Sequence, residues 1–338
     1  MNGRLRKGEE TMRNMTKKLE GIILAVIFSC ALLFGGALFA QDKYPSKPIT
    51  MVVSWAPGGG QDMVVRAIEP DFVKAFGQPA IITNKPGGGS TIGFNEIMKA
   101  SPDGYTIGPG SPNLLICRYT IKDAGIDYRN FEPIVYVANT VNAIIASKNA
   151  PWNNLKELLD WAKKNPGKLR VGNSGYGAFA HLSAIAMEMA FKSKFIHVPY
   201  KGGAPSLPAL MGGHLDVIVN SLGDVLHLIK GGEMKALGVA STERDKFIPE
   251  VQTFRELGMD VVFGSYYTWV GPKGIPKDRI TILYRALRKS AESKEFIQFC
   301  DQQGISIDIK GPEEFAKFLA EEDRRWRKVI EVGGIKPQ

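Results

Sequence analysis

Five segments with glycine or hydroxyl side chains, each following a strand-like run, carry the residues best suited to chemistry in this sequence. The first is Ala56-Pro57-Gly58-Gly59-Gly60-Gln61-Asp62, which follows the β-branched run Ile49–Trp55 and precedes a helical pattern. Glycine lets the backbone approach a ligand closely, and the first turn of a helix presents unpaired N–H groups with partial positive charge. Such a segment suits an anion, although taken alone it is equally well explained as a simple glycine turn.

The other four segments repeat this arrangement along the chain. They lie at residues 84–91, 111–113, 173–177 and 200–203, and each follows a predicted strand. Ligands of open α/β sheets bind beyond the carboxyl ends of the strands, so five such segments at equivalent ends are expected to converge. Together they indicate an anionic ligand held by several loops.

Catalytic patterns are incomplete. The stretch Gly172-Asn173-Ser174-Gly175-Tyr176 is close to G-x-S-x-G, but tyrosine occupies the final glycine position, so the nucleophile elbow is absent. The histidines show no metal-ligand spacing, and the first loop lacks both the P-loop lysine and the third Rossmann glycine. His181 has the strongest claim to function, because it falls in the first turns of a helix, whereas His197 fits a core or surface position. We expect no cofactor or metal, and an exported hydrolase or lyase that uses Ser174 or His181 is the enzymatic alternative.

The charge pattern argues against nucleic acid as a partner. The net charge is +9, and part of it lies in the first 40 residues. The one dense basic cluster, residues 324–328, follows acidic residues in the same predicted helix. Acidic residues early and basic residues late complement the helix dipole, so this cluster is interpreted as a solvated helix face.

The N-terminus predicts export. Basic residues precede an apolar run at residues 21–39, and small Ala40 precedes a polar start, which is typical of a signal peptide over residues 1–40. A retained membrane anchor is the alternative. An exported chain meets oxidising conditions, so Cys117 and Cys300 either form a disulfide or serve as small buried apolar side chains.

Strand-like and helical runs alternate through the rest of the chain, which predicts an α/β fold with parallel strands covered by helices. Pro70 is expected to kink or split the helix over 61–76, and one helix is expected over 279–300. Two extended stretches, 134–147 and 261–270, flank a middle α/β block. We therefore expect two α/β lobes, the first built from residues 41–138 and 265–338 and the second from 139–264, joined by a two-strand hinge.

Several spaced motifs resemble the Bug/TctC family, the extracytoplasmic solute receptors of tripartite tricarboxylate transporters. They are Tyr44-Pro45-Ser46-Lys47-Pro48-Ile49, the 56–62 loop, Asn84-Lys85-Pro86-Gly87-Gly88-Gly89, Val198-Pro199-Tyr200-Lys201-Gly202-Gly203-Ala204-Pro205 and Gly212-Gly213-His214-Leu215-Asp216. The resemblance covers essentially the whole chain after residue 40. It implies a periplasmic, monomeric binding protein of the two-lobed, type II-like fold, which delivers a small carboxylate-bearing ligand to membrane permease subunits. A receptor that reports to a signalling partner is a further alternative.

The resemblance also implies that backbone amides and hydroxyls of the loops hold the ligand without an arginine clamp. The candidate ligand-binding residues are Trp55, Gly59, Gly60, Asp62, Gly88, Ser90, Thr91, Ser111, Asn113, Ser174, Gly177, His181, Tyr200, Lys201, Asn220 and Asp224. Ser54-Trp55 and Asn220 depart from the usual family residues, so the ligand is not transferable from a relative. Four aromatic residues, Trp55, Tyr266, Tyr267 and Trp269, suggest either an aromatic wall beside the cleft or ordinary core packing.

Overall fold

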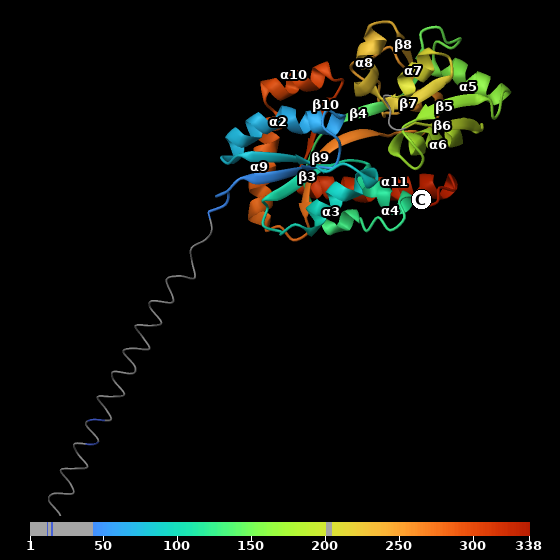
Figure 1. Cartoon of the computed structure of the whole chain (residues 1–338). Helices are drawn as coiled ribbons and strands as arrows, with labels where there is room; N and C mark the ends of the chain where they lie inside the picture. The colour runs from blue at the N-terminus through green and yellow to red at the C-terminus, as the bar shows by residue number, and fades with distance from the viewer. Residues whose placement is uncertain (1–11, 13–14, 16–42, 201–204) are drawn as a thin grey trace, which may run out of the picture. The chain divides into compact units, whose positions relative to one another are not determined.

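The computed structural model describes residues 12, 15, 43–200 and 205–338 (Figure 1). The chain divides between residues 46 and 47, and the fold given below is that of Lys47–Gln338. Apart from residues 12 and 15, the predicted signal peptide lies outside the described residues, and so does Lys201.

One lobe is built from both ends of this unit. Its parallel strands place β1 between β2 and β3, and β3 pairs antiparallel with β9. Figure 1 shows the blue N-terminal elements packed together with the orange and red C-terminal ones. The elements of this first lobe are β1 (Ile49–Val53), α2 (Gly60–Phe76), β2 (Ala80–Asn84), α3 (Thr91–Lys99), β3 (Thr106–Gly110), α4 (Asn113–Thr120), β9 (Gly264–Pro272), α9 (Lys277–Ala291), α10 (Lys294–Gln302), β10 (Ser306–Lys310) and α11 (Pro312–Val332).

The middle of the chain forms the second lobe. Its strand β5 pairs in parallel with both β6 and β7. The elements are α5 (Leu155–Lys164), β5 (Leu169–Asn173), α6 (Phe179–Phe191), β6 (Phe195–Pro199), α7 (Ser206–Met211), β7 (Val217–Ser221), α8 (Leu222–Lys230) and β8 (Met234–Val239).

A single long strand, β4 (Phe131–Ser147), joins the two lobes. Its first part pairs with β9 and β10, and its last part pairs with β7 and β8. The described strands therefore form one continuous sheet in the order β2-β1-β3-β9-β4-β7-β5-β6, with β8 and β10 beside β4. This arrangement confirms the predicted two-lobed α/β fold. The predicted lobe boundaries fall within β4 and at the start of β9, and they stay predictions.

One helix prediction is wrong, and one alternative of another is excluded. Pro70 does not split α2, because a proline removes only one helical N–H bond and this helix is otherwise well anchored by buried side chains; a kink at Pro70 stays a prediction. The single helix expected over 279–300 is instead α9 and α10, because the Ser293 hydroxyl accepts a hydrogen bond from the Phe296 amide at 3.2 Å and begins a new helix. Helix α4 was not predicted from the sequence.

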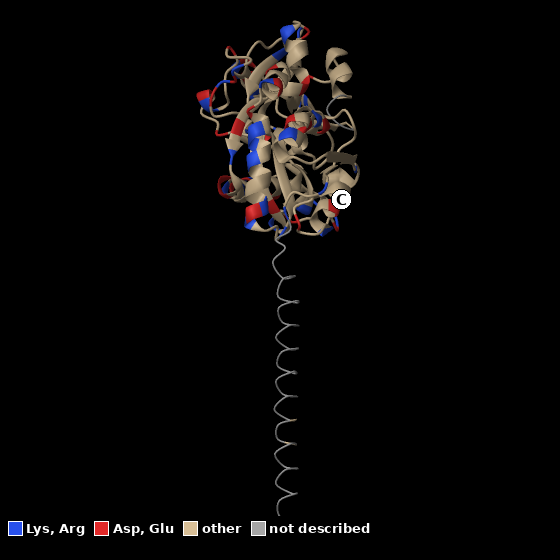
Figure 2. Ribbon diagram, turned by 90° about the vertical axis from the view of Figure 1, so that its left-hand side faces the viewer, with Lys and Arg blue, Asp and Glu red and all other residues tan. Residues whose placement is uncertain are grey.

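The basic cluster late in α11 belongs to a helix with internal ion pairs. Trp326, in its centre, is buried and donates from Nε1 to Glu322 at 3.1 Å. Arg325 pairs with Glu322 at 2.7 Å, and Arg327 pairs with Asp323 at 3.1 Å. Figure 2 shows blue and red residues interspersed on the face in view rather than a patch of one sign.

Candidate functional site

The first glycine loop is shaped by the buried carboxylate of Asp62. Its Oδ2 accepts hydrogen bonds from the Gly58 amide and from Arg66 Nε, both at 2.8 Å, and its Oδ1 accepts from Asn84 Nδ2, also at 2.8 Å. Burial acts to raise the pKa of Asp62, but these hydrogen bonds outweigh it and lower the pKa below its ordinary value. Asp62 is therefore ionised, and both of its oxygens are already occupied inside the protein.

The turn held by Asp62 leaves the first amides of α2 free. Gly59 precedes the helix, and its N–H donates to the Ala56 carbonyl at 3.3 Å. The amides of Gly60 and Gln61 lie in the first helical turn and have no hydrogen-bond partner among the described residues. These two donors lie at the positive end of the helix dipole, which is where an anion is stabilised.

The second loop contains a strained, buried serine. Residues 87–90 all have positive φ, and Ser90 is the one non-glycine residue among them, at +85°. A Cβ on Gly88 would lie 2.4 Å from Thr91 Oγ1, so the loop is closely packed on the start of α3. A non-glycine residue held in this conformation costs free energy and points to a functional constraint.

Ser111 and Asn113 follow β3 and lie beside Ser90 of the second loop. Ser111 Oγ accepts a hydrogen bond at 3.1 Å from the amide of Asn113, the first residue of α4. The Asn113 side chain donates from Nδ2 to Ser90 Oγ at 3.4 Å. Three predicted residues from two loops thus form one hydrogen-bonded group.

The loop between β5 and α6 meets the first lobe. A cavity of about 100 Å³ is lined by Gly89 and α4 on one side and by residues 176–178 on the other. A Cβ on Gly177 would lie 3.0 Å from Thr120 Cβ in α4, so the two lobes are in contact here. The amides of Ser174 and Tyr176 have no hydrogen-bond partner among the described residues. This loop therefore offers two further donors next to the lobe interface.

The hinge side of the site contains Tyr267 and Asp224. The Tyr267 hydroxyl lies 3.7 Å from the point that a Cβ on Gly60 would occupy. Asp224 is exposed in the first turn of α8, yet surrounding protein limits its hydration enough to raise its pKa. Burial raises the pKa of Tyr267, and the charge of Asp224 raises it further, which indicates that the two side chains are near one another.

Three polar side chains of the candidate site each have one buried atom without a hydrogen-bond partner among the described residues. Asn220, a predicted residue, accepts from the Ser221 amide at 2.9 Å, but its buried Nδ2 has no partner within the described residues. Asn173 Nδ2 and Gln61 Oε1 are also buried without partners there. Neither Asn173 nor Gln61 was predicted as a binding residue. Asn173 lies at the end of β5 and Gln61 at the start of α2. Strand ends and helix starts were the positions from which the predicted binding residues were chosen, so the same criterion could have found these two.

Two of the four aromatic side chains considered for a cleft wall belong to the core. Tyr266 is 2% exposed and Trp269 is fully buried. Trp55 is half-buried, with its ring edge-on to Phe94 at 5.7 Å between centroids. Tyr200 is also half-buried and packs against the core of the second lobe. Of the four, Trp55 is the one that is not buried; Tyr267 is 7% exposed, with its hydroxyl near Gly60.

Cys117 and Cys300 are free and buried, so the disulfide alternative is wrong; burial raises the pKa of each thiol to about 12. Within residues 43–200 and 205–338, no group of three His, Cys, Asp or Glu side chains is placed to hold a metal ion. None of the described helices is both long enough and apolar enough to span a bilayer.

Comparison with known proteins agrees with this architecture. Residues 64–335 match the family model of the tripartite tricarboxylate transporter family receptor, TctC. A UPF0065 protein of Bordetella pertussis is 30% identical over 318 residues, which cover 94% of this chain and 98% of that protein.

Solved structures extend the likeness to the fold. The periplasmic binding protein BugD is 30% identical with a TM-score of 0.75, covering 87% of this chain and all of BugD. An R. palustris protein solved with adipate is 27% identical with a TM-score of 0.77, again covering 87% of this chain and the whole of that one. The family is one of solute receptors rather than enzymes. This chain therefore belongs to the TctC family of tripartite tricarboxylate transporter receptors, and it is a two-lobed, periplasmic-type solute-binding protein.

Proposed function

We propose that this receptor captures a small dicarboxylate, or another small carboxylate-bearing acid, between its two lobes. The observation that carries the proposal is a set of loop amides without hydrogen-bond partners among residues 43–200 and 205–338, those of Gly60 and Gln61 in one lobe and Ser174 and Tyr176 in the other. Hydrogen bonds to an ionised group contribute about 1.5–3 kcal/mol each. A ligand with a carboxylate at each end would use both sets of donors, and the likeness to a protein solved with adipate supports this class.

Neutral donors, rather than a cationic side chain, would do most of the binding. Arg66, beside the first loop, is engaged by Asp62 at 2.8 Å, and Lys85, beside the second, pairs with Glu96 at 3.3 Å. Both cations are thus already committed to carboxylates. Recognition by backbone amides at helix starts provides anion affinity without placing a second charge in the cleft.

The lobes would close around the ligand. We place the boundaries at residues 138–139 and 264–265, where β4 and the approach to β9 cross between the lobes. The cavity at the lobe interface, about 100 Å³, corresponds to the liquid volume of roughly three water molecules, so entry of an acid would require the lobes to part. Domain closure about a few strand residues is a common response to a ligand in such proteins.

Export and delivery complete the proposed function. Residues 1–40 would direct the chain to the periplasm as a signal peptide, and the mature monomer would present its closed form to permease subunits in the membrane. Mass spectrometry of the exported protein tests cleavage near Ala40. Retention of the intact N-terminus in the membrane fraction would contradict it.

A ligand screen tests the binding proposal. The ligand-stripped protein is heated with succinate, malate, adipate and benzoate in turn, and each acid is recovered afterwards for mass analysis. An acid at about 100 times its Kd adds about 2.7 kcal/mol to the free energy of unfolding, which raises the melting temperature by several degrees. Tight binding of benzoate would favour a role for Trp55 and Tyr267 in ligand contact. Consumption of any acid would favour the enzymatic alternative, and no shift with any acid would contradict the proposed class.

A further inference from the structure

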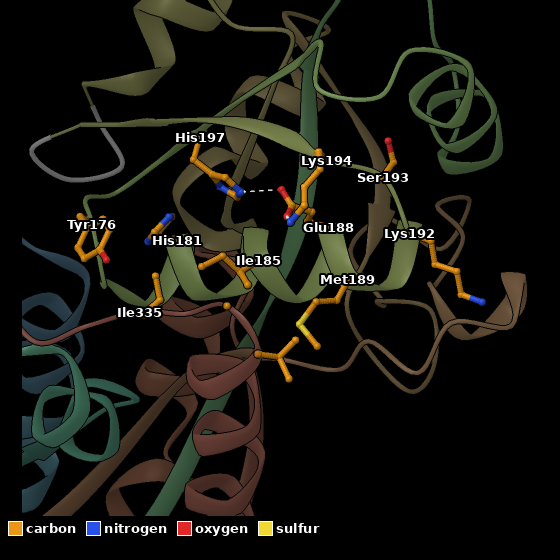
Figure 3. Close-up of a pocket in the computed structure, with 12 residues that line it drawn as sticks. Tyr176, His181, Ile185, Glu188, Met189, Lys192, Ser193, Lys194, His197 and Ile335 are labelled. Carbon is orange, nitrogen blue, oxygen red and sulfur yellow. Dashed lines mark hydrogen bonds and ion pairs between the residues drawn. The ribbon is translucent and has the colours of Figure 1, made fainter.

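A second pocket, separate from the smaller interlobe cavity, surrounds His181. Its volume is about 470 Å³, and it is lined by α6, the turn before β6 and β6 itself from the second lobe, and by the end of α11 from the first (Figure 3). His181 lines this pocket, and it is not among the described residues that line the smaller interlobe cavity. Its side chain therefore lies behind the 174–178 loop rather than beside the proposed ligand.

One hydrogen bond connects His181 to that loop. The Gly177 amide donates to His181 Nδ1 at 3.0 Å, and the imidazole is 5% exposed. A nitrogen that accepts a hydrogen bond carries no proton, so the neutral ring must be protonated at Nε2. Burial, with a smaller contribution from His197, lowers the pKa of His181 to about 4, so the ring is neutral at pH 7.

The ring of His181 is held by its neighbours. Figure 3 shows it between Tyr176 and His197, with ring centroids 5.2 and 5.1 Å away respectively. His197 is oriented by Glu188, whose Oε2 lies 3.0 Å from His197 Nε2. Glu188 Oε2 in turn accepts from the Phe195 amide at 2.8 Å. Contacts that run from Phe195 in β6 through Glu188 and His197 thus fix the orientation of the His181 ring, and with it the direction in which Nδ1 accepts a hydrogen bond.

We propose that His181 is a positioning residue for the binding loop. Its Nδ1 fixes the Gly177 amide and, through it, the placement of the neighbouring Tyr176 amide, in the part of the loop that lines the cavity with α4, and of the Ser174 amide that precedes it. Gly175 is fixed separately, because its amide donates to Asn173 Oδ1 at 3.1 Å. The inference rests on the proposed function only in assigning those two free amides to the ligand.

Two substitutions separate the hydrogen-bond acceptor from the packing of the ring. In His181→Asn, Oδ1 is attached to Cγ as Nδ1 is in histidine, so it can still accept from Gly177; His181→Leu fills the space without an acceptor. For the tightest-binding acid among succinate, malate and adipate, we expect Kd to rise about tenfold in the Leu variant, the effect of about 1.4 kcal/mol. We expect less than a threefold rise in the Asn variant. His227→Leu, an exposed position on α8, is the matched control and should leave Kd unchanged.

Equal weakening by the Asn and Leu substitutions would overturn the proposal, because packing alone would then explain it. Unchanged affinity in the Leu variant would overturn it as well.

A measurement without ligand distinguishes this proposal from the proposed function. In ¹⁵N NMR spectra at pH 7, the His181 ring should be neutral with its proton on Nε2. Hydrogen exchange at the Gly177 amide should be faster in His181→Leu than in wild type, and close to wild type in His181→Asn. A ring protonated at Nδ1, or identical Gly177 exchange in all three proteins, would overturn the positioning role. If these signatures are seen and no acid binds, the proposed ligand class fails while the role of His181 in holding the loop stands.

Discussion

Replacing Asp62 by alanine should destabilise the ligand-free protein. The carboxylate is 1% exposed and accepts three hydrogen bonds, from Gly58, Arg66 and Asn84. Arg66 and Gly58 are exposed and their donors can return to water, whereas the half-buried Asn84 side chain loses one acceptor and keeps the Trp55 carbonyl, 3.0 Å away. One incompletely satisfied donor costs about 1–3 kcal/mol, so the expected loss in free energy of unfolding is about 1–3 kcal/mol. Urea denaturation without ligand measures it.

Two further variants show whether this reasoning is correct. Asp62→Asn keeps one acceptor oxygen, so about half of the destabilisation should be recovered. Asp278→Ala removes an exposed acid from the first turn of α9, where only the helix dipole is affected, and should cost less than about 1 kcal/mol. If Asp62→Ala costs no more than Asp278→Ala but still abolishes ligand binding, Asp62 contacts the ligand directly and the positioning role is refuted.

Three other outcomes follow from the structure. Gly177→Ala should lower the free energy of unfolding by about 1–2 kcal/mol and weaken ligand binding, because φ is +67° and an added Cβ would lie 3.0 Å from Thr120. The control Gly167→Ala, at φ +73° with open space around it, should leave binding unchanged. Equal ligand affinities of the two variants would contradict this prediction. The pKa of His181 is lowered to about 4, so the neutral ring's contribution to stability should be lost as pH falls from about 6.5 toward 4. Urea midpoints measured at pH 7 and pH 5 test this. If the wild-type midpoint shifts no more than that of His181→Asn, the predicted pH dependence is wrong. Cys117 and Cys300 should resist alkylation in the native protein and react fully after unfolding without reductant, as peptide mapping would show.

Much of the fold was predictable because its local signals agree with one another. The alternation of apolar runs and glycine loops predicts strands over 169–173 and 195–199 and a helix over 179–191, and β5, β6 and α6 have these bounds. Helix α4 was missed because Leu114 to Cys117 are all buried, so its sequence is apolar on every side and shows no helical period. The break between α9 and α10 was missed because one serine cap interrupts a pattern that otherwise continues.

The loops of the site were predictable, but the roles of individual side chains were not. Strand ends place the loops, and parallel strands bring those ends to one edge of the sheet. Which polar atoms stay free depends on hydrogen bonds within the folded loops. Asp62 and His181 were predicted as ligand contacts, which stays a prediction; that they accept hydrogen bonds from the Gly58 and Gly177 amides was not predicted. Such pairings depend on backbone geometry that glycine spacing alone does not encode.

The central claim is that backbone donors of the two lobes bind a dianionic acid. Isothermal titration calorimetry of the ligand-stripped protein with adipate and with its neutral diamide, adipamide, tests this most directly, with succinate and malate run in parallel. We expect saturable one-to-one binding of at least one of the three diacids and no measurable binding of the diamide. Binding of the diamide as tight as that of adipate, or no heat with any diacid, would contradict the account.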